Sequence, residues 1–133
     1  MKLIVCLDEK NGMAFNRRRQ SRDRVLTDDL VRHVGAAPLF VTPYSLPLFE
    51  GHAIDLHPCD RPCAEAPRDA WCFLETQAPD PAVMPDVLLI YRWNRHYPSD
   101  LRFTLPLTDY RLAETLEFVG SSHETITKEV WIR

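Results

Sequence analysis

The chain has 133 residues, enough for about one domain with a modest hydrophobic core, and we expect residues 1–133 to form a single α/β domain. Apolar residues make up 45% and charged residues 26%, which excludes an intrinsically disordered chain. The formal net charge is −3, so no global charge draws the protein to nucleic acid or to a membrane, and any such attraction has to be local.

No apolar run reaches the roughly 20 residues that a membrane helix needs. The first apolar run, at residues 3–7, is also too short for a signal peptide. We therefore predict a cytoplasmic protein without a membrane partner. The four cysteines are then expected to be reduced thiols, with Cys6 and Cys72 in the core.

The pattern of apolar residues predicts a mixed, mostly parallel sheet with few helices and an antiparallel C-terminal hairpin. In chain order, we expect a strand at 3–7, a polar loop at 11–24, a helix at 25–34, a strand at 38–42, a short helix at 44–50, an irregular segment at 51–69 with a short strand at 53–56, strands at 70–74, 87–93 and 101–105, and a hairpin of strands 110–118 and 125–132.

Local signals mark the ends of two of these elements. Asp23 or Thr27 can cap the start of the helix at 25–34, and Gly35 is a plausible stop. The corner of the C-terminal hairpin is Gly120-Ser121-Ser122-His123.

Several segments, in this order, resemble dihydrofolate reductases. They are residues 4–13, a buried strand followed by an Asp, a turn and a Gly; 38–41; 85–92; 98–103, with its aspartate-x-x-phenylalanine spacing; and 127–133. The resemblance implies a dihydrofolate-reductase-like fold in which the polar loop covers the carboxyl edge of the sheet. It also implies a ligand site at that edge.

The chain departs from the family where the family binds its cofactor and substrate. The strand at 71–74 continues into Glu75-Thr76-Gln77, where the family has a Gly-Gly turn against the cofactor pyrophosphate. Residues 42–44 offer no arginine for the phosphate of NADPH, and 16–19 replace the family's Pro-Trp step. Either Asp23 or Asp28 could stand for the family's substrate carboxylate. We therefore expect the fold to carry over and NADPH reduction not to.

A second resemblance, through the opening strand and the Gly-Ser-Ser-His corner, is to small uncharacterised bacterial proteins sometimes labelled ribonuclease Z. Metallo-β-lactamase-type nucleases need a His-x-His-x-Asp-His cluster to hold two metal ions. The chain lacks this cluster and is too short for that fold, so this activity does not follow.

The polar loop is the most function-like feature, because five arginines lie within eight residues. Guanidinium groups bind phosphate or carboxylate through paired hydrogen bonds, which predicts an anionic ligand. The competing interpretation is a solvated basic loop balanced by neighbouring aspartates. The candidate ligand-binding residues of this region are Asn11, Asn16, Arg17, Arg18, Arg19, Gln20, Ser21 and Arg24.

Two further groups of residues are candidates. Trp93, Asn94 and Arg95 could stack on and hydrogen-bond a planar ring, although a simple turn explains them as well. Ser121, Ser122 and His123 offer hydroxyls beside an imidazole, and they also suit a hairpin corner. Asp23 and His123 are the candidate catalytic residues, and they would have to converge in space to act.

Metal binding is not predicted, although His52, His57, Cys59 and Cys63 are weak candidate ligands. Their spacing, His-x4-His-x-Cys-x3-Cys, matches no standard zinc finger.

The sequence thus predicts a small domain that binds a nucleotide-like or pterin-like anion without complete reductase machinery. The alternatives are an enzyme, as a divergent NADPH-dependent reductase or a small hydrolase using Asp23 or His123, and an RNA-associated protein or ribonuclease that uses the arginines of residues 17–24. No motif identifies a cofactor, and nothing in the sequence sets the oligomeric state.

Overall fold

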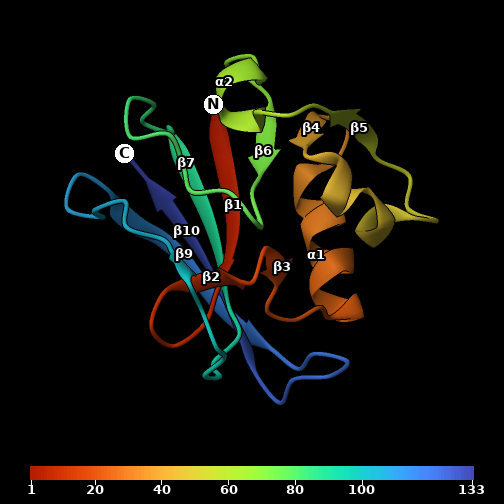
Figure 1. Ribbon diagram of the computed structural model, residues 1–133, viewed down its shortest axis with the longest axis vertical. Coiled ribbons are helices and arrows are strands. Elements are labelled where there is room, and N and C mark those ends of the chain that lie inside the picture. The colour runs from red at the N-terminus through yellow and green to blue at the C-terminus, as the bar shows by residue number, and fades with distance from the viewer.

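A seven-stranded mixed sheet in the order β5-β4-β6-β1-β7-β10-β9 forms the centre of the fold in the computed structural model, which describes residues 1–133 (Figure 1). The strands β1, β4, β5, β6 and β7 run parallel, whereas β10 is antiparallel to both β7 and β9. This confirms the predicted fold class. The bounds are β1 (Lys2–Leu7), β4 (Pro38–Val41), β5 (Asp55–Pro58), β6 (Trp71–Phe73), β7 (Val87–Arg92), β9 (Arg111–Phe118) and β10 (Ile126–Ile132).

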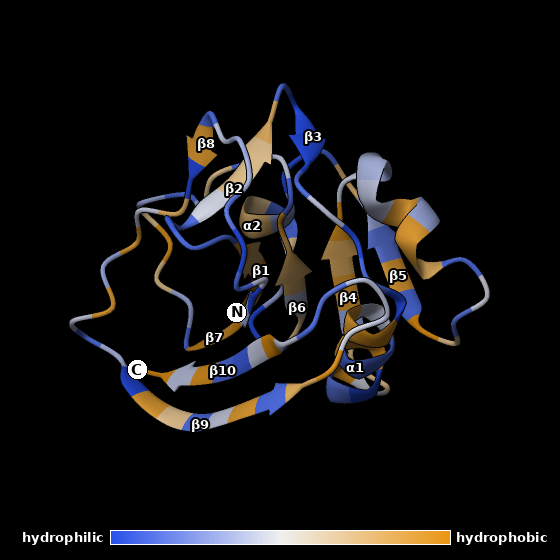
Figure 2. Ribbon diagram, turned by 90° about the horizontal axis from the view of Figure 1, so that it is seen from below, coloured by the Kyte–Doolittle hydropathy of each residue, from blue (hydrophilic) through white to orange (hydrophobic).

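The central strands are buried on both faces, which explains their continuous apolar runs. Ile4 of β1 and Leu89 of β7 face α1 (Arg24–Val34) and the 3-10 helix η1 (Pro43–Phe49). Their neighbours Leu3 and Leu88 face the opposite core, which contains Met13 and other residues outside the main sheet. In Figure 2, α1 and the small strands β2, β3 and β8 lie on opposite sides of the sheet.

The structure confirms the helix at 25–34 and selects Asp23 as its cap. The Asp23 side chain accepts hydrogen bonds from the backbone N–H groups of Val25 and Leu26, whereas Thr27 lies inside the helix. Gly35 ends the helix with a φ of 62°, a conformation that costs glycine little.

The expected loop at 11–24 is wrong in part, because it contains a hairpin of β2 (Gly12–Phe15) and β3 (Arg18–Arg19). Asn16 and Arg17 form its two-residue turn with φ values of 52° and 60°. This hairpin lies across the carboxyl ends of the parallel strands, at the lower end of β1 in Figure 1.

The expected strand at 101–105 is reduced to β8 (Leu101–Arg102), which pairs with β2 in a three-stranded sheet. Such short pairings leave no periodic pattern in the sequence.

Two smaller expectations also need correction. Residues 51–69 contain a short helix, α2 (Pro62–Glu65), which is too brief to show helical periodicity, and β5 begins two residues later than expected. Cys72 is buried as expected, but Cys6 is only half-buried because it lines a pocket at the sheet edge. No helix in the structure is long and apolar enough to cross a membrane.

Candidate functional site

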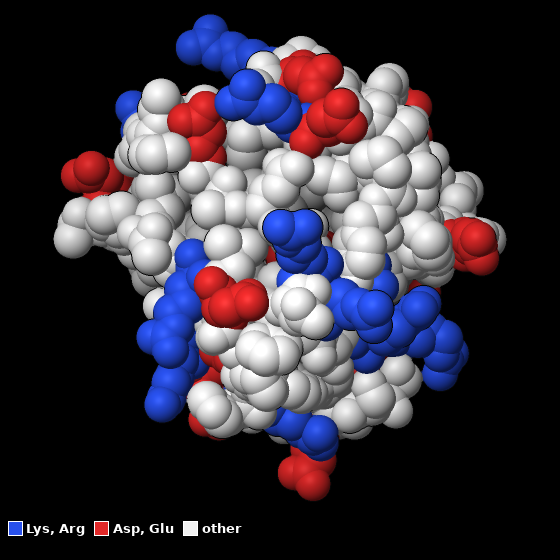
Figure 3. Space-filling model, viewed as in Figure 1, with Lys and Arg blue, Asp and Glu red and all other residues white.

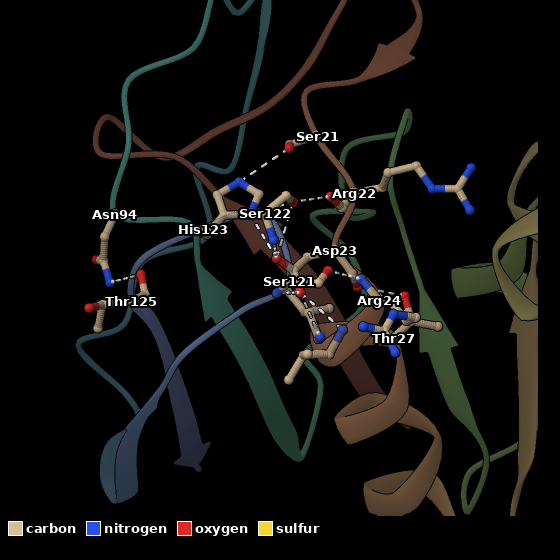
Figure 4. Close-up of polar contacts among 12 residues, drawn as sticks. Ser21, Arg22, Asp23, Arg24, Thr27, Asn94, Ser121, Ser122, His123 and Thr125 are labelled. Carbon is tan, nitrogen blue, oxygen red and sulfur yellow. Dashed lines mark hydrogen bonds and ion pairs between the residues drawn. The ribbon is translucent and has the colours of Figure 1, made fainter.

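The carboxylate of Asp23 joins the start of α1 to the corner between β9 and β10. Its Oδ1 accepts hydrogen bonds from the N–H groups of Val25 at 3.0 Å and Ser121 at 2.9 Å. Its Oδ2 accepts from the N–H of Ser122 at 2.8 Å, and the Ser122 hydroxyl adds a contact at 3.2 Å. Figure 4 shows how residues about one hundred positions apart in the sequence converge on this carboxylate.

His123 completes this arrangement. Its Nδ1 lies 3.0 Å from Asp23 Oδ2, and its Nε2 lies 2.8 Å from the Tyr97 hydroxyl and 3.2 Å from Ser21 Oγ. The indole of Trp93 stacks on the imidazole at 4.6 Å between ring centroids. The side chains of His123 and Asp23 are 1% and 0% exposed, so the pair is shielded from water. We call Ser21, Asp23, Trp93, Tyr97, Ser122 and His123 the Asp23 cluster.

The ionisation of Asp23 fixes the tautomer of His123. Burial by itself would raise the pKa of Asp23, but the N–H groups of Ser121 and Ser122 and the ring of His123 outweigh it and hold the pKa well below its ordinary value. Because the ionised carboxylate only accepts hydrogen bonds, Nδ1 of His123 carries the hydrogen. When the ring is neutral, the Nε2 lone pair therefore faces Ser21 and Tyr97.

Two adjoining cavities border this cluster between α1 and η1. The inner pocket has a volume of about 20 Å³, room for one water molecule, and Trp93 and Ser21 are among the residues that line it. The outer groove has a volume of about 310 Å³, at the small end of ligand sites in proteins. It is lined by Arg22, Asp23, Arg24, Thr27, Pro47, Leu48, Glu50 and His52.

The outer groove carries unpaired positive charge. Arg22 and Arg24 are exposed, and neither guanidinium forms an ion pair. The Asp23 carboxylate is buried and already bound by several hydrogen bonds, which leaves Glu50 as the remaining acidic group of the lining. Figure 3 shows Lys and Arg side chains gathered on the lower part of this face, over the β2–β3 hairpin and the N-terminal end of α1.

Arg19 is held inside the protein by Glu75. Its Nε donates to Glu75 Oε2 at 2.8 Å and its Nη2 to Oε1 at 3.0 Å, while the Ser45 hydroxyl donates to Oε1 at 2.7 Å. The ring of Tyr44 lies 4.4 Å from the guanidinium carbon. This side of the sheet edge is therefore filled by an internal ion pair, which we call the Arg19–Glu75 pair.

Residues at this edge do not fit a dinucleotide pyrophosphate. Glu75 lies just beyond the end of β6, where the Gly-Gly turn of dihydrofolate reductases was expected from the sequence. The carboxylate of Glu75 repels a phosphate, and the Arg19 guanidinium that could offset this repulsion is already paired with Glu75.

The other candidate ligand-binding residues serve the hairpin and turns or project into solvent. Gln20 Nε2 donates to Asp8 and to the Pro98 carbonyl, Asn11 accepts from Arg92, and Asn94 Nδ2 donates to Thr125 and Thr127. The residues that are exposed and line neither the inner pocket nor the outer groove are Asn11, Asn16, Arg17, Arg18, Asn94 and Arg95.

The candidate carboxylates and metal ligands are separated by the fold. Asp28 pairs with His52 Nε2 at 2.9 Å, outside the inner pocket, so neither Asp23 nor Asp28 offers a free carboxylate to it. His57 pairs with Asp55 and stacks on Phe40. No group of three or more His, Cys, Asp or Glu is placed to hold a metal ion, and this includes His52, His57, Cys59 and Cys63.

The sequence did not predict that Tyr97 contacts His123. Tyr97 belongs to a turn after β7 and reaches His123 only because the β7 end and the β9–β10 corner meet. No spacing of residues in the sequence indicates this contact. The one available signal for an aromatic side chain at this place was the nearby candidate Trp93.

Comparisons with known proteins agree on the fold alone. No protein-family model matches the sequence, and no curated protein sequence matches it. Among solved structures, the dihydrofolate reductase from Enterococcus faecalis complexed with NADP(H) and RAB-propyl is similar with a TM-score of 0.63 and 11% identity, covering 99% of this chain and 95% of that one. The chain therefore has a dihydrofolate-reductase-like fold, with a sequence that has diverged far from that enzyme.

Proposed function

We propose that this chain is a cytoplasmic, single-domain ligand-binding protein that holds a small nucleotide-like or pterin-like anion in the outer groove and does not use NADPH. The observation that carries the proposal is the pair of arginines without ion-pair partners, Arg22 and Arg24, beside a groove of about 310 Å³. Its size suits a small molecule, and its arginines suit phosphate or carboxylate.

The absence of a fitting cofactor site supports binding rather than reduction. The Arg19–Glu75 pair fills the sheet edge, so a hydride donor has no phosphate anchor there. The inner pocket admits only a water-sized group, which places the planar part of the ligand in the outer groove. The four free cysteines are consistent with a reducing compartment.

A thermal-shift panel tests this function with adenosine monophosphate, folate, NADPH and a short RNA as probes. We expect adenosine monophosphate or folate alone to raise Tm by several degrees at saturating concentration. NADPH should add nothing to that rise. A rise that requires NADPH would contradict the proposal, and a rise with RNA that disappears at moderate salt would favour the RNA-associated alternative.

The double variant Arg22→Ala, Arg24→Ala locates the site. We expect it to lose the ligand-induced shift while keeping the fold, because both side chains are exposed. The matched control is Arg17→Ala, Arg18→Ala, which removes two exposed arginines of the β2–β3 hairpin that do not line the groove. Equal loss of the shift in both variants would show a general charge effect instead of a site.

A further inference from the structure

The Asp23 cluster contains a hydroxyl, an imidazole and a carboxylate in relay. Ser21 Oγ lies 3.2 Å from Nε2 of His123, and Nδ1 of the same ring lies 3.0 Å from Asp23 Oδ2. Nucleophilic serines are recognised by this geometry of nucleophile, base and orienting carboxylate, independent of fold and of order along the chain. The three residues come from the segment before α1, the helix cap and the β9–β10 corner, so no sequence motif joins them.

We propose that Ser21 is a nucleophile for short-chain carboxylic esters, with His123 as its general base and Asp23 as the positioning residue. The Asp23 carboxylate is fixed by backbone N–H groups on both oxygens, so it holds the imidazole in one orientation. The imidazole in turn is clamped by the indole of Trp93. This assignment does not depend on the anion proposed for the outer groove.

Ser21 is accessible from the inner pocket. It is half-buried and is one of the residues that line that pocket, whose volume of about 20 Å³ admits one water-sized group, so only the methyl of an acetyl group enters it. The backbone N–H groups of Arg22 and Asp23, which follow it, donate to no acceptor in the protein. Two unpaired N–H groups next to a nucleophile are suited to bind the oxygen that becomes negative in the transition state.

The reaction balances with the ester and water alone. Ser21 Oγ bonds to the carbonyl carbon while its proton passes to Nε2 of His123. The bond from carbon to the alkoxy oxygen then breaks, and Nε2 returns the proton to the leaving alcohol. Water attacks the acyl-serine through the same base, which releases the carboxylic acid and restores the Ser21 hydroxyl.

Tyr97 restrains this chemistry in the resting protein. Its hydroxyl lies 2.8 Å from Nε2 and 3.4 Å from Ser21 Oγ, so it competes with the serine for the same lone pair. Removing this hydroxyl gives Ser21 sole use of Nε2. The relay therefore predicts a gain of reactivity in Tyr97→Phe, which a purely structural hydrogen-bond network does not.

The test is labelling of the intact protein with methanesulfonyl fluoride, whose one methyl group fits the inner pocket, followed by peptide mass spectrometry, and hydrolysis of p-nitrophenyl acetate. We expect a single methanesulfonyl adduct on Ser21, loss of both signals in Ser21→Ala, and faster labelling in Tyr97→Phe. His123→Gln should slow labelling by about 100-fold or more. Ser99→Ala, which removes a hydroxyl outside the cluster, should label like the wild type.

Asp23→Asn tests the positioning role through the imidazole itself. We expect loss of the downfield Nδ1–H resonance of His123 in the proton NMR spectrum together with slower labelling. An adduct on Ser122 instead of Ser21 overturns the assignment, as does wild-type labelling in a folded His123→Gln protein. If His123→Gln fails to fold, unchanged or slower labelling in Tyr97→Phe is sufficient to overturn it.

Discussion

Gly120 shows at the scale of one residue why the β9–β10 corner has its sequence. A Cβ at this position would overlap the Asp23 carboxylate and lie 2.9 Å from Ile126 Cδ1. The glycine therefore allows the corner to approach Asp23 closely enough for the N–H groups of Ser121 and Ser122 to bind it.

We predict that Gly120→Ala lowers the free energy of unfolding by about 2–3 kcal/mol, because it displaces a buried, multiply bonded carboxylate. Urea denaturation measures the loss. The control is Gly51→Ala, where open space surrounds the new methyl group and only the φ of 79° is strained, at a cost of about 1 kcal/mol. Equal losses in the two variants would mean that Asp23 is not packed against Gly120.

The thiols differ in their readiness to react. The hydrogen bond between Cys63 and Cys72, at a distance of 3.6 Å between the sulfurs, lowers the pKa of Cys63, and burial only partly opposes it. The same contact and burial raise the pKa of Cys72, and burial raises the pKa of Cys6. Burial and the charge of Glu65 also raise the pKa of Cys59.

We therefore predict that iodoacetamide alkylates Cys63 first, about tenfold or more ahead of Cys6 and Cys72, because the thiolate is the reacting form. A time course followed by peptide mass spectrometry measures the order. Cys72→Ala removes the hydrogen bond and should slow Cys63. Faster labelling of Cys59 than of Cys63 in the wild type would contradict the prediction.

The N-terminus of α1 is the element whose stability depends most directly on pH. The folded-state pKa of Asp23 lies well below the value of about 3.9 in an unfolded chain, so the unfolded state takes up the proton first as pH falls. The stabilisation by this carboxylate is complete above about pH 5 and is lost progressively below pH 4.

We predict that Asp23→Asn is about 3 kcal/mol less stable than the wild type at pH 7, because several buried N–H donors lose their charged acceptor. The gap should narrow as pH falls from 5 to 3. Urea denaturation of both proteins at several pH values measures it. Parallel stability curves for the two proteins would exclude a depressed pKa at Asp23.

The elements differ in how well the sequence predicted them, and their length explains why. Continuous apolar runs revealed β1 and β7, because strands buried on both faces leave long uninterrupted signals. The short strands β2 and β3 were missed and β8 was predicted too long, since the pairing of β3 and β8 with β2 comes from tertiary contacts. The sequence identified Asp23 and His123 as candidate catalytic residues. Their contact in the folded protein depends on the strand register of β7, β10 and β9, which no local sequence pattern contains.

At the scale of the whole molecule, the dihydrofolate-reductase-like fold extends over 99% of the chain, and an internal ion pair stands at the edge of its sheet. The Arg19 and Glu75 side chains are 19% and 8% exposed, so the pair is largely removed from water. Breaking one half of such a pair leaves a charge that needs a new partner.

Glu75→Gly should therefore convert this edge into an anion site. The variant is best made on the Arg22→Ala, Arg24→Ala background, so that the outer groove does not contribute. In phosphate-free buffer we expect its Tm to fall by about 5 °C or more, because Arg19 is left half-buried without a partner. Millimolar phosphate should recover part of this loss by pairing with the freed guanidinium.

The matched control adds Arg19→Ala to Glu75→Gly, which removes both charges and should abolish the response to phosphate. The parent variant, in which the Arg19–Glu75 pair is intact, should not respond to phosphate either. Its Arg19 guanidinium is already hydrogen-bonded to both carboxylate oxygens of Glu75. A thermal scan with and without phosphate decides the matter for all three proteins. If Glu75→Gly gains no stability from phosphate, the Arg19–Glu75 pair is not what keeps phosphate from this edge of the sheet.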